Sequence, residues 1–259
     1  MATTFDPGIC HELFVTLCEQ APDESAYPYS AFRVEWGPIF YRGRLDGTAR
    51  VLCIGQDPAQ NEAVVRRILI GVAGHRVQGF LAKLGIDRSY VMINTFLYSI
   101  YNQGRAAPHT KDAAVAGYRN RWFSALLASG SLEAVVSFGS LADTAWREFT
   151  KSSDVAAALP YRHVPHPTSP ESAGGTPQQI EAATTAMLTN WNSALQSLRQ
   201  YWPRKAGHGN QNRQTHVLSD CRRDLKQFSI SGRKSVKPGD KHVLDRLGHH
   251  YLGAQVWIF

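Results

Sequence analysis

The chain has 259 residues, of which 43% are hydrophobic, enough for one large domain or for a domain of about 200 residues with an appendage. No run approaches the ~18 apolar residues of a membrane span, and Met1 to Pro7 has neither a basic start nor an apolar stretch, so we expect no export signal and a cytoplasmic protein. Residues 1–202 contain 17 Lys or Arg and 17 Asp or Glu, whereas residues 203–259 contain 11 and 4, so the net charge of +7 lies in the tail.

The first predicted element is a helix at the N-terminus. Asp6-Pro7 predicts its start, because Asp caps helices and Pro is favoured at the first helical position. The apolar stripe that follows at helical spacing is Ile9, Leu13, Phe14 and Leu17. Residues 22–49, rich in Pro, Gly and aromatic residues, are typical of an irregular segment that could include a short hairpin.

Strands and helices then alternate four times. The apolar runs that predict strands are 51–54, 90–94, 134–138 and 161–164. The apolar faces that predict helices are Val77, Phe80, Leu81 and Leu84; Val115, Tyr118, Trp122 and Leu126; Leu141, Ala145, Trp146 and Phe149; and Ile180, Met187, Trp191, Leu195 and Leu198. Gly85 ends the first of these helices, Ser140 is expected to cap the third, and Thr176 to Gln179 form a capping box for the fourth.

This alternation predicts an α/β fold, a three-layer αβα sandwich around a central four-stranded parallel sheet. Right-handed crossovers bring the carboxyl ends of all four strands to one edge, where ligands bind in such sheets. The residues expected there are Gly55, Gln56, Asp57, Asn94, Gly139, Ser140 and His166.

The composition changes after Tyr201-Trp202-Pro203. We expect a domain over residues 1–202 and a basic C-terminal extension over residues 203–259. Its charged pairs Arg222-Arg223 and Arg233-Lys234 fit either a solvated surface or contacts with DNA phosphates. The four cysteines, Cys10, Cys18, Cys53 and Cys221, form no Cys-x-x-Cys pair, so we expect reduced thiols and no metal site.

An Asp, an Asn and a His at one edge could serve hydrolysis. Asp57 could orient or deprotonate a water molecule, although Asp-Pro is also common in turns. Asn94 offers an acceptor and two donors and could read a polar edge in either direction. His166 could donate to a developing anion.

Four blocks together resemble the uracil-DNA glycosylase superfamily in order and spacing: Gly55-Gln56-Asp57-Pro58, Asn94, residues 135–140, and His166-Pro167-Thr168-Ser169-Pro170. The likeness covers about residues 48–200. The first and last blocks are similar to the main bacterial and eukaryotic branch, whereas residues 66–74 look more like the iron–sulfur branch. The cluster cysteines of that branch are missing, so no cluster and no other cofactor is expected.

The resemblance implies a monofunctional DNA glycosylase, acting as a monomer, that removes uracil from single- or double-stranded DNA in base excision repair. Asp57 would position or activate the attacking water and His166 would hydrogen-bond uracil O2. Asn94 would bond N3–H and O4, and the Gln56 backbone would contact O2 beside Gly55. The base would first be flipped out of the stack. The residues expected to contact DNA are Pro58, Arg66, Arg67, Ser140, Pro167, Thr168 and Ser169, with a solvated helix face as the alternative for the two arginines.

Three positions depart from the family pattern. Ala59 stands where the main branch has a Tyr that blocks the methyl group of thymine, and Leu69 stands about where an aromatic residue stacks on the base. The loop Thr168 to Ser172 has no Leu to fill the gap left by a flipped base, which leads us to expect a preference for single-stranded DNA. The alternatives are a glycosylase for thymine or other damaged bases, a non-catalytic module for uracil or abasic DNA, and a hydrolase of a free nucleoside.

Overall fold

The computed structural model describes residues 5–201, so the expected extension over residues 203–259 lies outside the described residues. Within this range the main sheet has the strand order β2-β4-β3-β6-β7. Its strands are β2 (Tyr41–Gly43), β3 (Val51–Gly55), β4 (Tyr90–Asn94), β6 (Ala134–Phe138) and β7 (Tyr161–Val164). A separate two-stranded ribbon pairs β1 (Phe32–Arg33) with β5 (Ser99–Ile100).

The sheet has five strands where the sequence predicts four. β3, β4, β6 and β7 are parallel as expected, and β2 adds to the edge of the sheet antiparallel to β4. β2 lies in the segment 22–49, for which we expected an irregular structure that could include a short hairpin, and it pairs with β4 instead of forming a hairpin within the segment. Its three residues are too short for a periodic pattern, and only the pairing with β4 makes them a strand.

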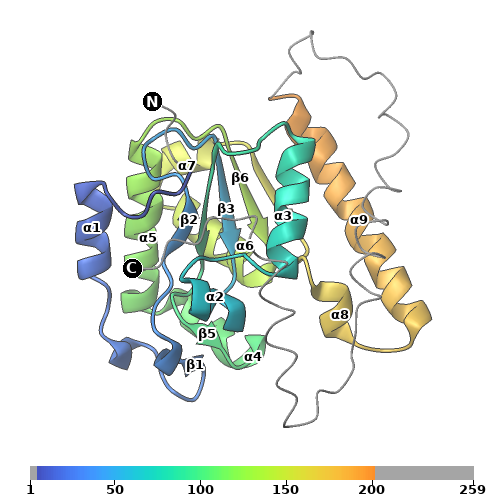
Figure 1. Ribbon diagram of the computed structural model, residues 1–259, viewed down its shortest axis with the longest axis horizontal. Coiled ribbons are helices and arrows are strands. Elements are labelled where there is room, and N and C mark those ends of the chain that lie inside the picture. Colours follow the sequence, from blue (N-terminus) through green and yellow to red (C-terminus); the bar gives the residue numbers. More distant parts are fainter. Residues whose placement is uncertain (1–4, 202–259) are drawn as a thin grey trace, which may run out of the picture. The chain divides into compact units, whose positions relative to one another are not determined.

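The fold is of the α/β class, and helices cover both faces of the mostly parallel sheet (Figure 1). The α-helices are α1 (Glu12–Glu19), α2 (Gln60–Val65), α3 (Val72–Lys83), α4 (Gln103–Ala106), α5 (Ala113–Ala128), α6 (Ser140–Thr150), α7 (Asp154–Ala158), α8 (Ser169–Ala173) and α9 (Pro177–Arg199). Short 3₁₀ turns occupy Glu24–Ala26, Val34–Trp36 and Ala107–Lys111. No helix among residues 5–201 is long and apolar enough to cross a membrane.

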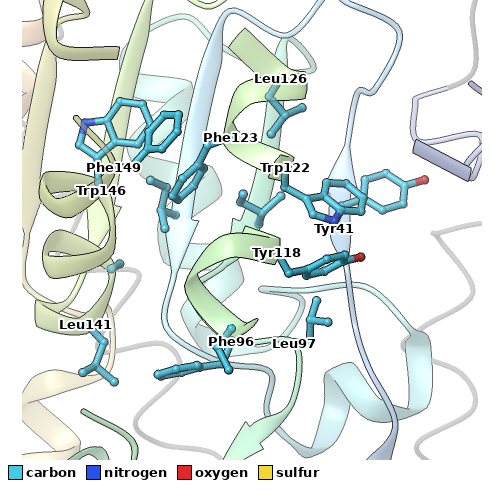
Figure 2. Packing of buried hydrophobic residues seen from close by; sticks show 14 of the residues in the cluster. Tyr41, Phe96, Leu97, Tyr118, Trp122, Phe123, Leu126, Leu141, Trp146 and Phe149 are labelled. Atoms are coloured by element: carbon cyan, nitrogen blue, oxygen red, sulfur yellow. The ribbon is translucent and has the colours of Figure 1, made fainter. Parts of the chain in front are cut away.

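The larger part of the core lies between the sheet and the helices α1, α5 and α6. Figure 2 shows Phe123 of α5 near Trp146 and Phe149 of α6, and the ring centroids of Phe123 lie 5.3 and 5.1 Å from theirs. On the opposite face Phe80 of α3 meets Trp191 of α9 at 5.5 Å. All of these residues except Phe123 belong to the predicted apolar faces, so the helical periodicity located both covering layers.

The start of the first helix differs from the prediction. α1 begins at Glu12, with His11 at its N-cap, rather than after Asp6-Pro7. Asp6 has a positive φ of 55°, and its carboxylate instead accepts hydrogen bonds from Arg67 and from the Gly43 amide. Asp6 therefore does not cap a helix, because its carboxylate pairs with the guanidinium of Arg67, 61 residues later in the chain.

The last helix begins as predicted. Thr176 Oγ1 accepts a hydrogen bond from the Gln179 amide, and Gln179 Oε1 accepts one from the Thr176 amide. This capping box sets the start of α9, which runs to Arg199.

Candidate active site at the carboxyl edge of the sheet

The carboxyl ends of the parallel strands meet at one edge, the lower edge in Figure 1, where α2, α4, α8 and the β1–β5 ribbon also lie. Gly55 and Asn94 are direct register partners at the ends of β3 and β4. His166 follows β7, which is separated from β3 by β6. A spacing of about 4.8 Å per strand puts the end of β7 roughly 10 Å from that of β3 and roughly 14 Å from that of β4.

Asp57 occupies a desolvated position directly after β3. One carboxylate oxygen accepts a hydrogen bond of 3.1 Å from the Ile100 amide of β5. Burial raises the pKa of Asp57 to about 7, against the opposing effects of that amide and of Arg33. The carboxyl is therefore poised to exchange a proton near neutral pH, which suits a general base.

The side chain of Asn94 is 7% exposed and has no hydrogen-bond partner on either Oδ1 or Nδ2. Leaving a buried amide unpaired costs about 1–3 kcal/mol for each unsatisfied group. A Cβ on Gly55 would lie 2.2 Å from Asn94 Oδ1 and 3.6 Å from a Leu69 methyl group, so only glycine fits at position 55. Gly55, Leu69 and Asn94 therefore lie close together, and the Asn94 amide among them has an unsatisfied acceptor and an unsatisfied donor.

Leu69 is held in place by its backbone. It has a positive φ of 51°, and its carbonyl accepts a hydrogen bond from Arg42. A Cβ on Gly74 would lie 1.6 Å from that carbonyl oxygen, so the first turn of α3 needs glycine there. This turn places a methyl group of Leu69 next to Gly55. The family resemblance puts an aromatic residue at this position.

Gln56 is buried, and its hydrogen bonds connect the end of β3 to the segments after β4 and β6. Its carbonyl accepts a hydrogen bond from the Phe96 amide, and its side-chain Oε1 accepts others from the Leu141 amide at 3.3 Å and from Gln103 at 3.2 Å. The N-cap of α6 is Gly139, not Ser140, and Ser140 is exposed with no capping hydrogen bond. The expected cap is therefore wrong, because Gln56 satisfies a backbone donor at the start of α6 from across the edge.

His166 is held as a neutral imidazole. Its Nδ1 accepts a hydrogen bond from the Thr168 amide and lies 3.0 Å from Thr168 Oγ1. Burial and the nearby charge of Arg76 lower its pKa to about 4, whereas Glu171 acts in the opposite direction. With Nδ1 as acceptor, the single ring proton is on Nε2, which can donate to a ligand.

The histidine loop, residues 166–173, is tied to α3 by Arg76. The guanidinium binds both carboxylate oxygens of Glu171, at 2.6 and 3.1 Å, and also donates to the Pro167 carbonyl. Within the loop the Ser169 amide donates to the His166 carbonyl, and Ser169 begins the short helix α8. The loop that carries His166 is therefore rigidly placed.

Several residues expected to contact DNA have other roles within the protein. Arg66 donates to the Trp36 and Pro38 carbonyls, and Arg67 pairs with Asp6 at 2.8 Å. Pro58 and Pro167 are buried and offer little surface, whereas Thr168 and Ser169 are half-buried on the histidine loop. Ala59 is exposed at the N-cap of α2.

The structure adds residues that the sequence reasoning missed. Glu62 is buried and accepts hydrogen bonds from the Ala59 and Ile70 amides, which fixes the loop between Asp57 and Leu69. A Glu three residues after a helix start was the available signal, but Ala59 lacks the hydroxyl of a capping box. Ile100 and Arg76 gave no local signal, since each acts through a contact more than 40 residues away in sequence.

The site can position a water molecule and stabilise an anion. Within residues 5–201 no group of three His, Cys, Asp or Glu side chains is arranged to hold a metal ion.

No protein-family model matches this chain, and no curated protein matches it.

Proposed function

We propose that this protein is a monofunctional uracil-DNA glycosylase that hydrolyses the N-glycosidic bond of deoxyuridine in DNA and leaves an abasic site. The observation that carries the proposal is the buried amide of Asn94, unpartnered on both polar atoms, at the same edge as Asp57 and His166. Uracil N3–H and O4 would satisfy Asn94 Oδ1 and Nδ2. With the Asn94 amide in this orientation, cytosine, which presents a bare N3 and an amino group there, would face acceptor against acceptor and donor against donor.

In the proposed reaction Asp57, as carboxylate, accepts a proton from a water molecule while the water oxygen bonds to C1′ of the sugar. The C1′–N1 bond breaks and its electron pair leaves with uracil as an anion. The Nε2–H of neutral His166 donates a hydrogen bond to uracil O2, where the negative charge accumulates. A neutral donor suits this task, because the pKa of His166 is lowered to about 4.

A wider substrate range is the second candidate, favoured by Ala59. Its side chain ends at Cβ and is exposed, so it supplies no bulk against the C5 methyl group of thymine. Thymine opposite guanine would then be a substrate, with the same bonds broken.

The test uses oligonucleotides with one uracil, single-stranded or paired, followed by alkali to break any abasic site. We expect cleavage at the uracil, and Asp57→Asn should lower the rate by about 10²–10⁴-fold while DNA binding is kept. Asn94→Asp, which can accept but not donate, should lose uracil excision without loss of fold. If the wild-type protein leaves the strand intact but still retards it in a gel-shift assay, the protein binds uracil-containing DNA without cleaving it, and the proposed catalysis is wrong. The same assay with a thymine–guanine duplex tests the second candidate.

A further inference from the structure

A stack of an aromatic ring, a guanidinium and a second aromatic ring stands beside the site. The Arg33 guanidinium carbon lies 4.3 Å from the Tyr101 ring centroid and 5.2 Å from the Trp36 ring centroid. Arg33 also donates to the Ile100 carbonyl, and the Ile100 amide is the donor to Asp57. We call Arg33, Trp36 and Tyr101 the platform. Ile100 connects the platform to the proposed general base, since its carbonyl accepts from Arg33 and its amide donates to Asp57.

The platform has open aromatic surface. Tyr101 is 43% exposed, and the nearby Tyr29 is 64% exposed on the turn before β1. The Tyr101 amide donates to the Ala31 carbonyl, and Arg105 of α4 donates to the Ser30 carbonyl. These backbone contacts fix the turn that carries Tyr29 against the segment that carries Tyr101.

Exposed apolar side chains gather on the same edge. Besides the two tyrosines, Val64 and Val65 of α2 and Val72 at the start of α3 are 80%, 50% and 46% exposed. Isolated exposed apolar residues are ordinary, but several of them on the elements of one edge mark an interaction surface.

We propose that the platform binds single-stranded DNA by stacking an unpaired base on Tyr101, next to the base in the active site. This inference rests on the proposed function for the identity of the DNA, and adds to it the strand form. An unpaired base offers a free face to Tyr101, whereas in a duplex the faces of the bases are buried in the stack.

The test measures binding of the full chain to a fluorescent oligonucleotide without uracil, as a single strand and as a duplex of the same sequence. Omitting uracil separates this proposal from catalysis: stacking can be present when excision is absent, and the reverse. We expect Tyr101→Ala to weaken single-strand binding by roughly fivefold or more, and Tyr29→Ala with Tyr101→Ala to weaken it further. Tyr101→Phe keeps the ring and should bind like the wild type.

Tyr201→Ala is the matched control. Tyr201 is 45% exposed, close to the value for Tyr101, and it follows the C-terminal end of α9. In Figure 1 α9 ends at the top, away from the carboxyl ends of the strands. The proposal is overturned if Tyr101→Ala and the double variant bind the single strand as tightly as Tyr201→Ala does. An equal loss for duplex and single strand also overturns it, as does a surface that binds a protein partner but no DNA.

Discussion

The side chains of Asn94, Asp57 and His166 are all held in states that water would not favour. The amide of Asn94 is buried without partners, burial raises the pKa of Asp57, and burial lowers the pKa of His166. Each state costs stability in the empty protein and serves the proposed reaction, since the donors and acceptors are oriented before the substrate arrives. Such a conflict between stability and activity is typical of active sites.

The pKa of Asp57 makes stability depend on pH in a defined direction. The folded protein holds this proton up to about pH 7, whereas the ordinary pKa is 3.8. Between these values the folded state binds more protons than the unfolded state, so stability falls as pH rises through this window. Asp57→Asn removes the effect and should be more stable than wild type at pH 8, by roughly 1–2 kcal/mol.

Thermal unfolding of both proteins, without DNA, from pH 4 to pH 8 checks this expectation. The difference in melting temperature should widen between pH 4 and pH 7 and then stay constant, because the contribution of His166 is the same in both proteins. A constant difference over the whole range would contradict a raised pKa. Excision by the wild type should in turn increase as pH rises through about 7, since only the carboxylate can accept the proton of water.

Short elements, more than long ones, shape the site. The ribbon of β1 and β5 supplies the amide that meets Asp57, α2 and Glu62 fix the turn to Leu69, and α8 carries the histidine loop. Each is too short to be stable alone and depends on contacts with the α/β core. The placement of His166 in particular depends on one side chain of α3, Arg76.

Arg76→Gln should disturb the histidine loop more than Glu171→Gln does. The first variant loses the ion pair and the contact with the Pro167 carbonyl, whereas the second leaves that contact in place. We expect Arg76→Gln to lower kcat about 10–100-fold with a smaller change in KM, because misplacing a catalytic group by about 1 Å has this effect.

Nuclear magnetic resonance titration of His166 gives a readout that a general loss of stability would not produce. The pKa of His166 should rise in Arg76→Gln, which removes a neighbouring positive charge, and fall in Glu171→Gln, which removes a negative one. Shifts in the same direction in both variants would contradict a direct electrostatic role for Arg76.

At the scale of the whole molecule, charge and site are in different parts of the chain. The described range lies within residues 1–202, which balance their charges, and the excess of +7 belongs to residues 203–259. Binding at the platform should therefore depend weakly on salt, and any strong salt dependence should come from the tail.

Neutralising Arg222, Arg223, Arg233 and Lys234 together to Gln tests this division in the full chain. If all four contact phosphates, the slope of log affinity against log salt for a single strand should fall by up to about 3. Uracil excision at saturating DNA should be unchanged, because Asp57, Asn94 and His166 lie outside the tail. An unchanged slope would assign these four residues to a solvated surface.

The sequence alone determined the alternating strands and helices of the fold and the edge of the sheet at which the candidate catalytic residues lie. Buried strands are continuous apolar runs and helices have a period of 3.6, so local pattern located β3, β4, β6 and β7 with the helices between them. Parallel strands with right-handed crossovers all end at one edge, which is why Asp57, Asn94 and His166 could be assigned to one edge in advance.

Only the tertiary structure decided how the edge is built. β2 joins the sheet through its pairing with β4, Gln56 satisfies the start of α6 in place of Ser140, and Arg67 is engaged by Asp6. These contacts join residues 48 to 85 positions apart, and they override the local patterns. A periodic pattern shows which face of an element packs on the core, but not which distant residue each side chain contacts there. Those tertiary contacts decide that the amide of Asn94 has no hydrogen-bond partner and that the platform lies beside Asp57.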